Sequence, residues 1–202
     1  MIIKKLDLTA FGKFKNKTLE LKEGLNLICG RNEAGKTTIH KFIEGMFFGF
    51  FKPYSKNKIY TTNLDKYRPW DGKGYCGAII YESEGREYRL ERGFEKGNEY
   101  VRLYDNKTGD DITSTLDFDP AFKLPKANKH LGINSVLFRN TVSIGQLSNV
   151  TDDDLYKEIG DLMLNTQGTM SGDISVSYTH LLRGICPPSV FLQDEASGEL
   201  LL

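Results

Sequence analysis

Residues 25–38 read LNLICGRNEAGKTT, a short apolar run followed by a glycine-rich loop. Residues 30–37 fit the pattern G-x-x-x-x-G-K-[ST], in which glycines let the backbone curve tightly around an oxygen-rich anion. The apolar run at 25–29 predicts a buried central strand, and the residues from Lys36 onward predict a helix. A buried strand, such a loop and a helix in succession predict a phosphate-binding site.

The loop predicts a role for each part of its backbone and side chains. Successive amides of residues 33–38 would point inward at a helix N-terminus, where partial positive charge collects. Lys36 would place its charge on the β and γ phosphates of ATP, and the Thr37 hydroxyl would bind Mg²⁺. The nucleotide-binding residues expected on this basis are Gly30, Glu33, Ala34, Gly35, Lys36, Thr37 and Thr38.

Regular patterns extend on both sides of the loop. Before it, alternation predicts an antiparallel pair of strands at residues 2–9 and 17–21, joined by the turn Phe11–Phe14. After it, apolar side chains recur on one face of the expected helix, namely Ile39, Phe42, Ile43 and Met46. Three further segments predict an antiparallel meander at 75–82, 86–92 and 99–104. Two helices are expected at 131–142 and 153–164.

Composition and charge limit the class of protein. The 202 residues are 39% hydrophobic and 27% charged, as in soluble globular proteins. The cysteines, Cys29, Cys76 and Cys186, are far apart, which argues against a disulfide framework or a zinc site and favours a reduced, cytoplasmic compartment. The longest apolar run, Met46–Phe51, is too short to span a bilayer, so no membrane association is expected.

The charge is unevenly distributed along the chain. Residues 1–70 carry 14 Lys and Arg against 6 Asp and Glu, whereas the remainder carries 13 against 21. A basic N-terminal part is suited to phosphates, of a nucleotide or of DNA. A lysine-rich solvated surface is the alternative.

Two common nucleotide-binding classes are disfavoured. A GTPase carries N-K-x-D for guanine, and the nearest candidate, Asn106–Gly109, departs from that pattern at its fourth position. A small-molecule kinase continues from the loop into parallel βα units, whereas an antiparallel meander is predicted here.

The opening strand, the F-G-K-F turn at residues 11–14 and LNLICGRNEAGKTT together resemble ATPase heads of the SMC, RecF and SbcC type. Residues 67–70, YRPW, followed by the segment 77–81, are similar to a bacterial subgroup of AAA-type ATPases with DNA-repair-like heads. The resemblance covers about residues 1–170. It implies an α/β P-loop NTPase fold: the N-terminal half of an ABC- and SMC-like head, with a mixed sheet and an antiparallel β-meander lobe.

The resemblance also implies further site residues. Gln146 matches the Q-loop glutamine, which acts with Lys36 in catalysis and contacts Mg²⁺ and the attacking water; a surface loop glutamine is the alternative. Asn32 resembles the loop asparagine that faces the γ-phosphate. Lys13 either approaches the nucleotide from the first turn or is a solvated lysine.

Other polar and aromatic residues have competing interpretations. The aromatic side chains of the loop at 52–74 either stack on a base or pack the loop onto the sheet; they are Tyr54, Tyr60, Tyr67 and Trp70. His40 is expected to pack or to lie at the surface, and His130 has no neighbour that suggests catalysis.

The expected organisation is half of a head followed by a foreign tail. Residues 1–175 would form the half-head, divided at 1–50, 51–112 and 113–175. Residues 176–181, VSYTHL, are encoded by DNA that resembles the mosaic end of a library-preparation transposase. Residues 176–202 are therefore expected to be non-native, a real but irregular C-terminus being the alternative. Residues 190–195, VFLQDE, imitate a catalytic strand without a preceding signature motif.

The function implied by the resemblance is ATP hydrolysis coupled to DNA repair or chromosome maintenance. In the complete protein, two heads would form a head-to-head homodimer on double-stranded DNA, with a nuclease as a possible partner. This chain lacks the coiled coil, signature motif and general base, so ATP binding without turnover is expected. A nucleotide-gated binding module and a transport-type ABC ATPase subunit are the alternatives.

Overall fold

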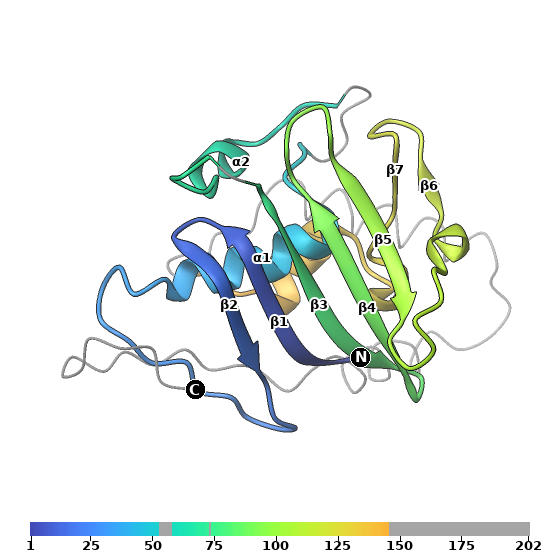
Figure 1. The fold of residues 1–202 in the computed structure, drawn as a ribbon, viewed down its shortest axis with the longest axis horizontal. Helices are drawn as coiled ribbons and strands as arrows, with labels where there is room; N and C mark the ends of the chain where they lie inside the picture. Colours follow the sequence, from blue (N-terminus) through green and yellow to red (C-terminus); the bar gives the residue numbers. More distant parts are fainter. Residues whose placement is uncertain (53–57, 73, 146–202) are drawn as a thin grey trace, which may run out of the picture.

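A five-stranded antiparallel sheet dominates the fold (Figure 1). The computed structural model describes residues 1–52, 58–72 and 74–145. The strand order is β2-β1-β3-β4-β5, and every pair of neighbours is antiparallel. The predicted first hairpin and meander are confirmed, with strands β1 (Ile2–Phe11), β2 (Phe14–Glu20), β3 (Cys76–Ser83), β4 (Arg86–Gly93) and β5 (Tyr100–Asp105).

The predicted central strand at residues 25–29 is wrong for the described part of the chain. Only Cys29 forms a bridge, and Leu25 and Leu27 are 66% and 42% exposed. A strand needs a hydrogen-bonding neighbour on at least one edge, and the five-stranded sheet does not provide one here. The sheet of the described residues is accordingly antiparallel rather than mixed.

Helix α1 (Lys36–Phe48) crosses one face of the sheet (Figure 1). Its buried side chains Ile39, Phe42 and Met46 lie in the same core as Leu6, Ile79, Leu90 and Leu103 of the strands. A Cβ on Gly77 would approach the Phe42 ring to 2.4 Å. The absence of a side chain at Gly77 therefore lets α1 pack closely against β3.

Aromatic rings fill the end of this core near the first turn. The fully buried Phe11 ring has its centroid 5.1 Å from that of Phe42, 5.8 Å from Tyr67 and 5.5 Å from Phe94. Tyr67 also accepts the amide of Gly12 on its carbonyl at 2.7 Å. The loop that contains Tyr67 is therefore anchored to the first hairpin.

Short elements cover the rest of the sheet and of α1. The predicted helix at 131–142 starts later, at Ser135, because Gly132 has a positive φ of 66° and the Asn134 side chain caps the amides of Val136 and Leu137. The predicted helix at 153–164 lies outside the described residues. The short elements are α2 (Thr62–Lys66), η1 (Thr113–Thr115), β6 (Phe118–Asp119), β7 (Leu124–Pro125), η2 (Lys129–Leu131), α3 (Ser135–Leu137) and the π-helical η3 (Phe138–Val142). None of the helices in this described part has the length and apolar character needed to cross a bilayer.

Candidate phosphate-binding site

The loop between Gly30 and α1 follows a backbone path that depends on two left-handed residues. Glu33 has a φ of 66° and Gly35 a φ of 108°. Between them, the amide of Ala34 donates to the carbonyl of Arg31 at 3.0 Å, closing a tight turn. The sequence folds this way because Gly35 adopts a positive φ without steric cost.

The start of α1 presents backbone donors next to this turn. The first helical hydrogen bond runs from the amide of Ile39 to the carbonyl of Gly35 at 3.0 Å. The amides of Lys36, Thr37 and Thr38 come before it and have no backbone acceptor among the described residues. Such amides carry the partial positive charge of a helix N-terminus, so this turn has the donors that an anion requires.

Lys36 folds back over the loop from the first turn of α1. Its ammonium donates to the carbonyl of Gly30 and, at 3.0 Å, to that of Arg31. The positive charge therefore lies against carbonyls of the same loop. Thr37, the next residue after Lys36, is exposed, so its hydroxyl is accessible to a hydrated cation such as Mg²⁺.

The first turn, Phe11–Phe14, packs directly against the loop. A Cβ on Gly35 would lie 2.4 Å from the Phe14 ring, and one on Gly12 would lie 2.8 Å from Thr38 Cγ2. The exposed Lys13 ammonium donates to the Glu33 carbonyl at 2.7 Å. Lys13 thus contacts the loop while its side chain stays exposed, and its approach to a nucleotide stays a prediction.

One face of α1 holds the segment 138–143 by three successive contacts. The Ser143 hydroxyl lies 2.6 Å from His40 Nε2, the Arg139 guanidinium lies 3.1 Å from the Glu44 carboxylate, and the rings of Phe48 and Phe138 are 5.0 Å apart. Burial, followed by the charge of Lys41, lowers the pKa of His40, so the neutral imidazole is favoured. Residues 40, 44 and 48 are four residues apart, the spacing of one helical face, but no motif in the sequence marks this face as a contact surface.

Gln146 itself lies outside the described residues, so its role stays a prediction. Ser143, three residues before Gln146, contacts His40. Because His40 is one turn along α1 from Lys36, the chain that leads to Gln146 lies near the start of this helix. The same limit applies to Tyr54, the segment 153–164 and the whole of 176–202.

The remaining aromatic residues of the long loop behave differently from one another. Tyr67 is buried against Phe11, and Tyr60 is half-buried and bonded to Glu99. These two pack the loop onto the body of the protein. Trp70, in contrast, is 89% exposed.

Parts of the chain are similar to known proteins. Residues 5–169 match the AAA domain family. The uncharacterized protein YhaN of Bacillus subtilis is 38% identical over 112 residues, which are 52% of this chain and 10% of that protein.

Two archaeal proteins that are named DNA double-strand break repair Rad50 ATPase are also similar. The protein of Archaeoglobus fulgidus is 30% identical over 94 residues, 46% of this chain and 10% of its own length. That of Sulfolobus acidocaldarius is 28% identical over 147 residues, 72% of this chain and 16% of its own length. The chain thus spans only 10 to 16% of the length of these three relatives.

Proposed function

The chain belongs to the AAA domain family, as a P-loop ATPase region of the SMC and Rad50 type, and we propose that it binds ATP with Mg²⁺ at residues 30–38. One observation carries this proposal: the amides of Lys36, Thr37 and Thr38 lack backbone acceptors among the described residues, and the Lys36 ammonium folds back onto carbonyls of the same loop. An oxygen-rich anion satisfies both kinds of donor at once.

Each loop residue has a defined task in this proposal. Lys36 exchanges the neutral carbonyls of Gly30 and Arg31 for charged phosphate oxygens, which form stronger hydrogen bonds. The hydroxyl of Thr37 holds Mg²⁺, which neutralises charge that develops on the phosphates. The backbone of Glu33, Ala34, Gly35 and Thr38 surrounds the phosphates, while Asn32 faces the γ-phosphate.

The finer proposal concerns hydrolysis and the complete head. Gln146 would orient water and contact Mg²⁺ at the end of the segment that His40 and Ser143 hold against α1. The exposed Leu25 and Leu27 next to the loop are suited to a strand that gains a neighbour from another part of a longer protein. That neighbour would turn the antiparallel sheet into the mixed sheet of a split ATPase head.

For the complete protein, we infer ATP-dependent engagement of two heads on double-stranded DNA, with a nuclease as a possible partner. The similarity to Rad50 ATPases supports this inference. We expect this chain alone to bind ATP without hydrolysing it. We expect the complete protein to hydrolyse ATP faster when DNA is present.

ATP binding to the Lys36→Ala variant tests the proposal. Isothermal titration calorimetry with Mg·ATP should show binding to the parent chain and a loss of at least tenfold on removal of the ammonium, about 1.4 kcal/mol or more. Lys17→Ala is the matched control, because Lys17 is exposed on β2 away from the loop. Equal affinity of Lys36→Ala and the parent chain would refute the site, and turnover by the chain alone would refute the expected inactivity.

A further inference from the structure

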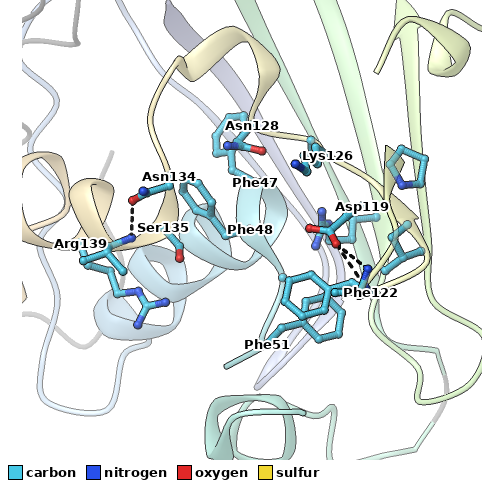
Figure 2. A pocket seen from close by; sticks show the side chains of 17 residues that line it. Phe47, Phe48, Phe51, Asp119, Phe122, Lys126, Asn128, Asn134, Ser135 and Arg139 are labelled. Atoms are coloured by element: carbon cyan, nitrogen blue, oxygen red, sulfur yellow. Dashed lines mark hydrogen bonds between the residues drawn. The ribbon is translucent and has the colours of Figure 1, made fainter. Parts of the chain in front are cut away.

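A cavity lies at the opposite end of α1 from the phosphate loop. It has a volume of about 410 Å³ and lies between the last turn of α1, the β6–β7 hairpin and the start of α3 (Figure 2). Since α1 has 13 residues, its two ends are about 20 Å apart. Four phenylalanines contribute to the wall, namely Phe47, Phe48, Phe51 and Phe122.

Arg92 is the unusual member of this wall. It follows Tyr88 and Leu90 on the inward face of β4 and is only 4% exposed. Its Nε is buried and has no hydrogen-bond partner. Burial lowers the pKa of Arg92 to about 9, and no carboxylate of the described residues offsets this effect.

The surroundings hold the Arg92 guanidinium in place without neutralising it. A Cβ on Gly49, the residue that ends α1, would lie 2.4 Å from Arg92 Nη1. The negative end of the helix dipole favours a cation at this position. The Nε donor of this group has no partner, so an acceptor that enters the cavity lined by Arg92 would satisfy it.

The other charged side chains of the cavity leave an excess of positive charge. Asp119 accepts the amides of Ala121 and Phe122 at 2.9 and 3.2 Å, so its carboxylate closes the hairpin turn. Arg139 is paired with Glu44. Lys126 is exposed at the rim (Figure 2), so Arg92 and Lys126 are the cations available to a ligand.

The rings supply a flat apolar surface next to these cations. Phe51 and Phe122 are stacked, with centroids 4.6 Å apart and an interplanar angle of 20°, and they lie together below Asp119 in Figure 2. A cavity with apolar walls and a few convergent polar groups is the usual form of a small-molecule site.

We propose that this cavity binds a small organic carboxylate with an aromatic or aliphatic body, its carboxylate on Arg92 and its body against Phe51 and Phe122. Arg92 matches a carboxylate because two parallel N–H donors meet two oxygens. This second site is separate from the ATP site and does not depend on it.

Benzoate is the probe that tests the site. Titration of the 202-residue chain with benzoate, followed by NMR chemical shifts, should show saturable binding that moves resonances of the cavity residues. Arg92→Met should weaken it at least tenfold, and Phe122→Ala should weaken it severalfold. Benzyl alcohol, without the charge, and inorganic phosphate, without the apolar body, should each bind at least tenfold more weakly than benzoate.

Controls separate this site from the phosphate loop and from misfolding. Lys36→Ala should bind benzoate like the parent chain, as should Lys107→Met on the distant turn after β5. If Arg92→Met does not fold, Lys126→Met at the exposed rim provides the test and should weaken benzoate at least twofold. No saturable benzoate binding, equal binding by Phe122→Ala and the parent, or phosphate binding as tight as benzoate would overturn the proposal.

Discussion

The two ends of α1 are built in opposite ways. At the N-terminal end, consecutive residues from Gly30 to Thr38 supply backbone amides and one lysine that crosses the loop. At the C-terminal end, a buried arginine of β4 shares a cavity with residues from three other parts of the chain, two of which supply aromatic rings. The first end presents positive charge from the backbone and from one lysine, whereas the second presents it from side chains.

The difference explains what holds each end in shape. The phosphate loop depends on left-handed backbone angles and on close contact with the turn Phe11–Phe14. The cavity depends on the packing of side chains that the sheet, a hairpin and α3 bring together. A substitution that restricts the backbone should therefore destabilise the first end most. A substitution that removes side-chain charge should instead weaken the contacts that the middle of α1 makes with the segment 138–143.

Gly35→Ala should have the largest effect on stability. The new Cβ would lie 2.4 Å from the Phe14 ring and would hold a φ of 108°. Left-handed backbone and overpacking together should lower the free energy of unfolding by about 3 kcal/mol, measured by urea denaturation. Gly24→Ala is the matched control: it also has a positive φ, with nothing within 4 Å of its Cβ, and should cost about 1 kcal/mol. Equal losses in the two variants would show that contact with Phe14 does not support the loop.

Local sequence patterns predicted some of these features but not others. Alternation predicted the strands of the meander, and the glycine pattern predicted the loop before α1, because both are short-range requirements. The segment 25–29 failed as a strand because its pairing depends on a neighbour that its own residues do not specify. Arg92 was not singled out from the sequence, because only the folded chain shows that it lies inward with Tyr88 and Leu90 and which groups surround its guanidinium.

Glu44→Gln should have an intermediate effect, in the middle of α1. The buried Glu44 carboxylate is paired with Lys41 at 2.6 Å and with Arg139 at 3.1 Å. Because both cations are partly exposed, loss of these pairs should cost about 1 to 2 kcal/mol rather than the full value of a buried pair. Urea denaturation gives the cost, and increased hydrogen exchange of residues 138–143 would show that this segment has loosened.

Asp65→Asn provides the control for Glu44→Gln. Asp65 is paired with Lys96 at 3.0 Å, but both side chains are well exposed, so the loss should stay below about 0.5 kcal/mol. A loss for Glu44→Gln as small as this would mean that the ion pairs on α1 do not hold the segment 138–143.

The smallest expected effect is a dependence on pH that acts mainly at the N-terminal end of α1. Burial lowers the pKa of His40 and of His130 below the ordinary value of 6.5. The unfolded chain therefore binds more protons near pH 6.5, and stability present above that pH is lost as the pH falls through it. The urea midpoint should decrease between pH 7.5 and pH 5.5, above the range in which Glu87 and Glu99, whose pKa values are lowered, take up protons.

His40→Gln separates the contributions of the two histidines to this decrease. The variant should retain only the part due to His130, whose ring accepts or donates a hydrogen bond at Tyr81 and stacks on Tyr88. In the parent chain, acid should perturb NMR resonances of Ser143, which bonds to His40, more than those of Phe138, which packs on Phe48. A midpoint that rises toward pH 5.5 would contradict the neutral state of both imidazoles. Equal perturbation of Ser143 and Phe138 would instead mean that α1 transmits the protonation of His40 along its whole length, and that its two ends are not independent.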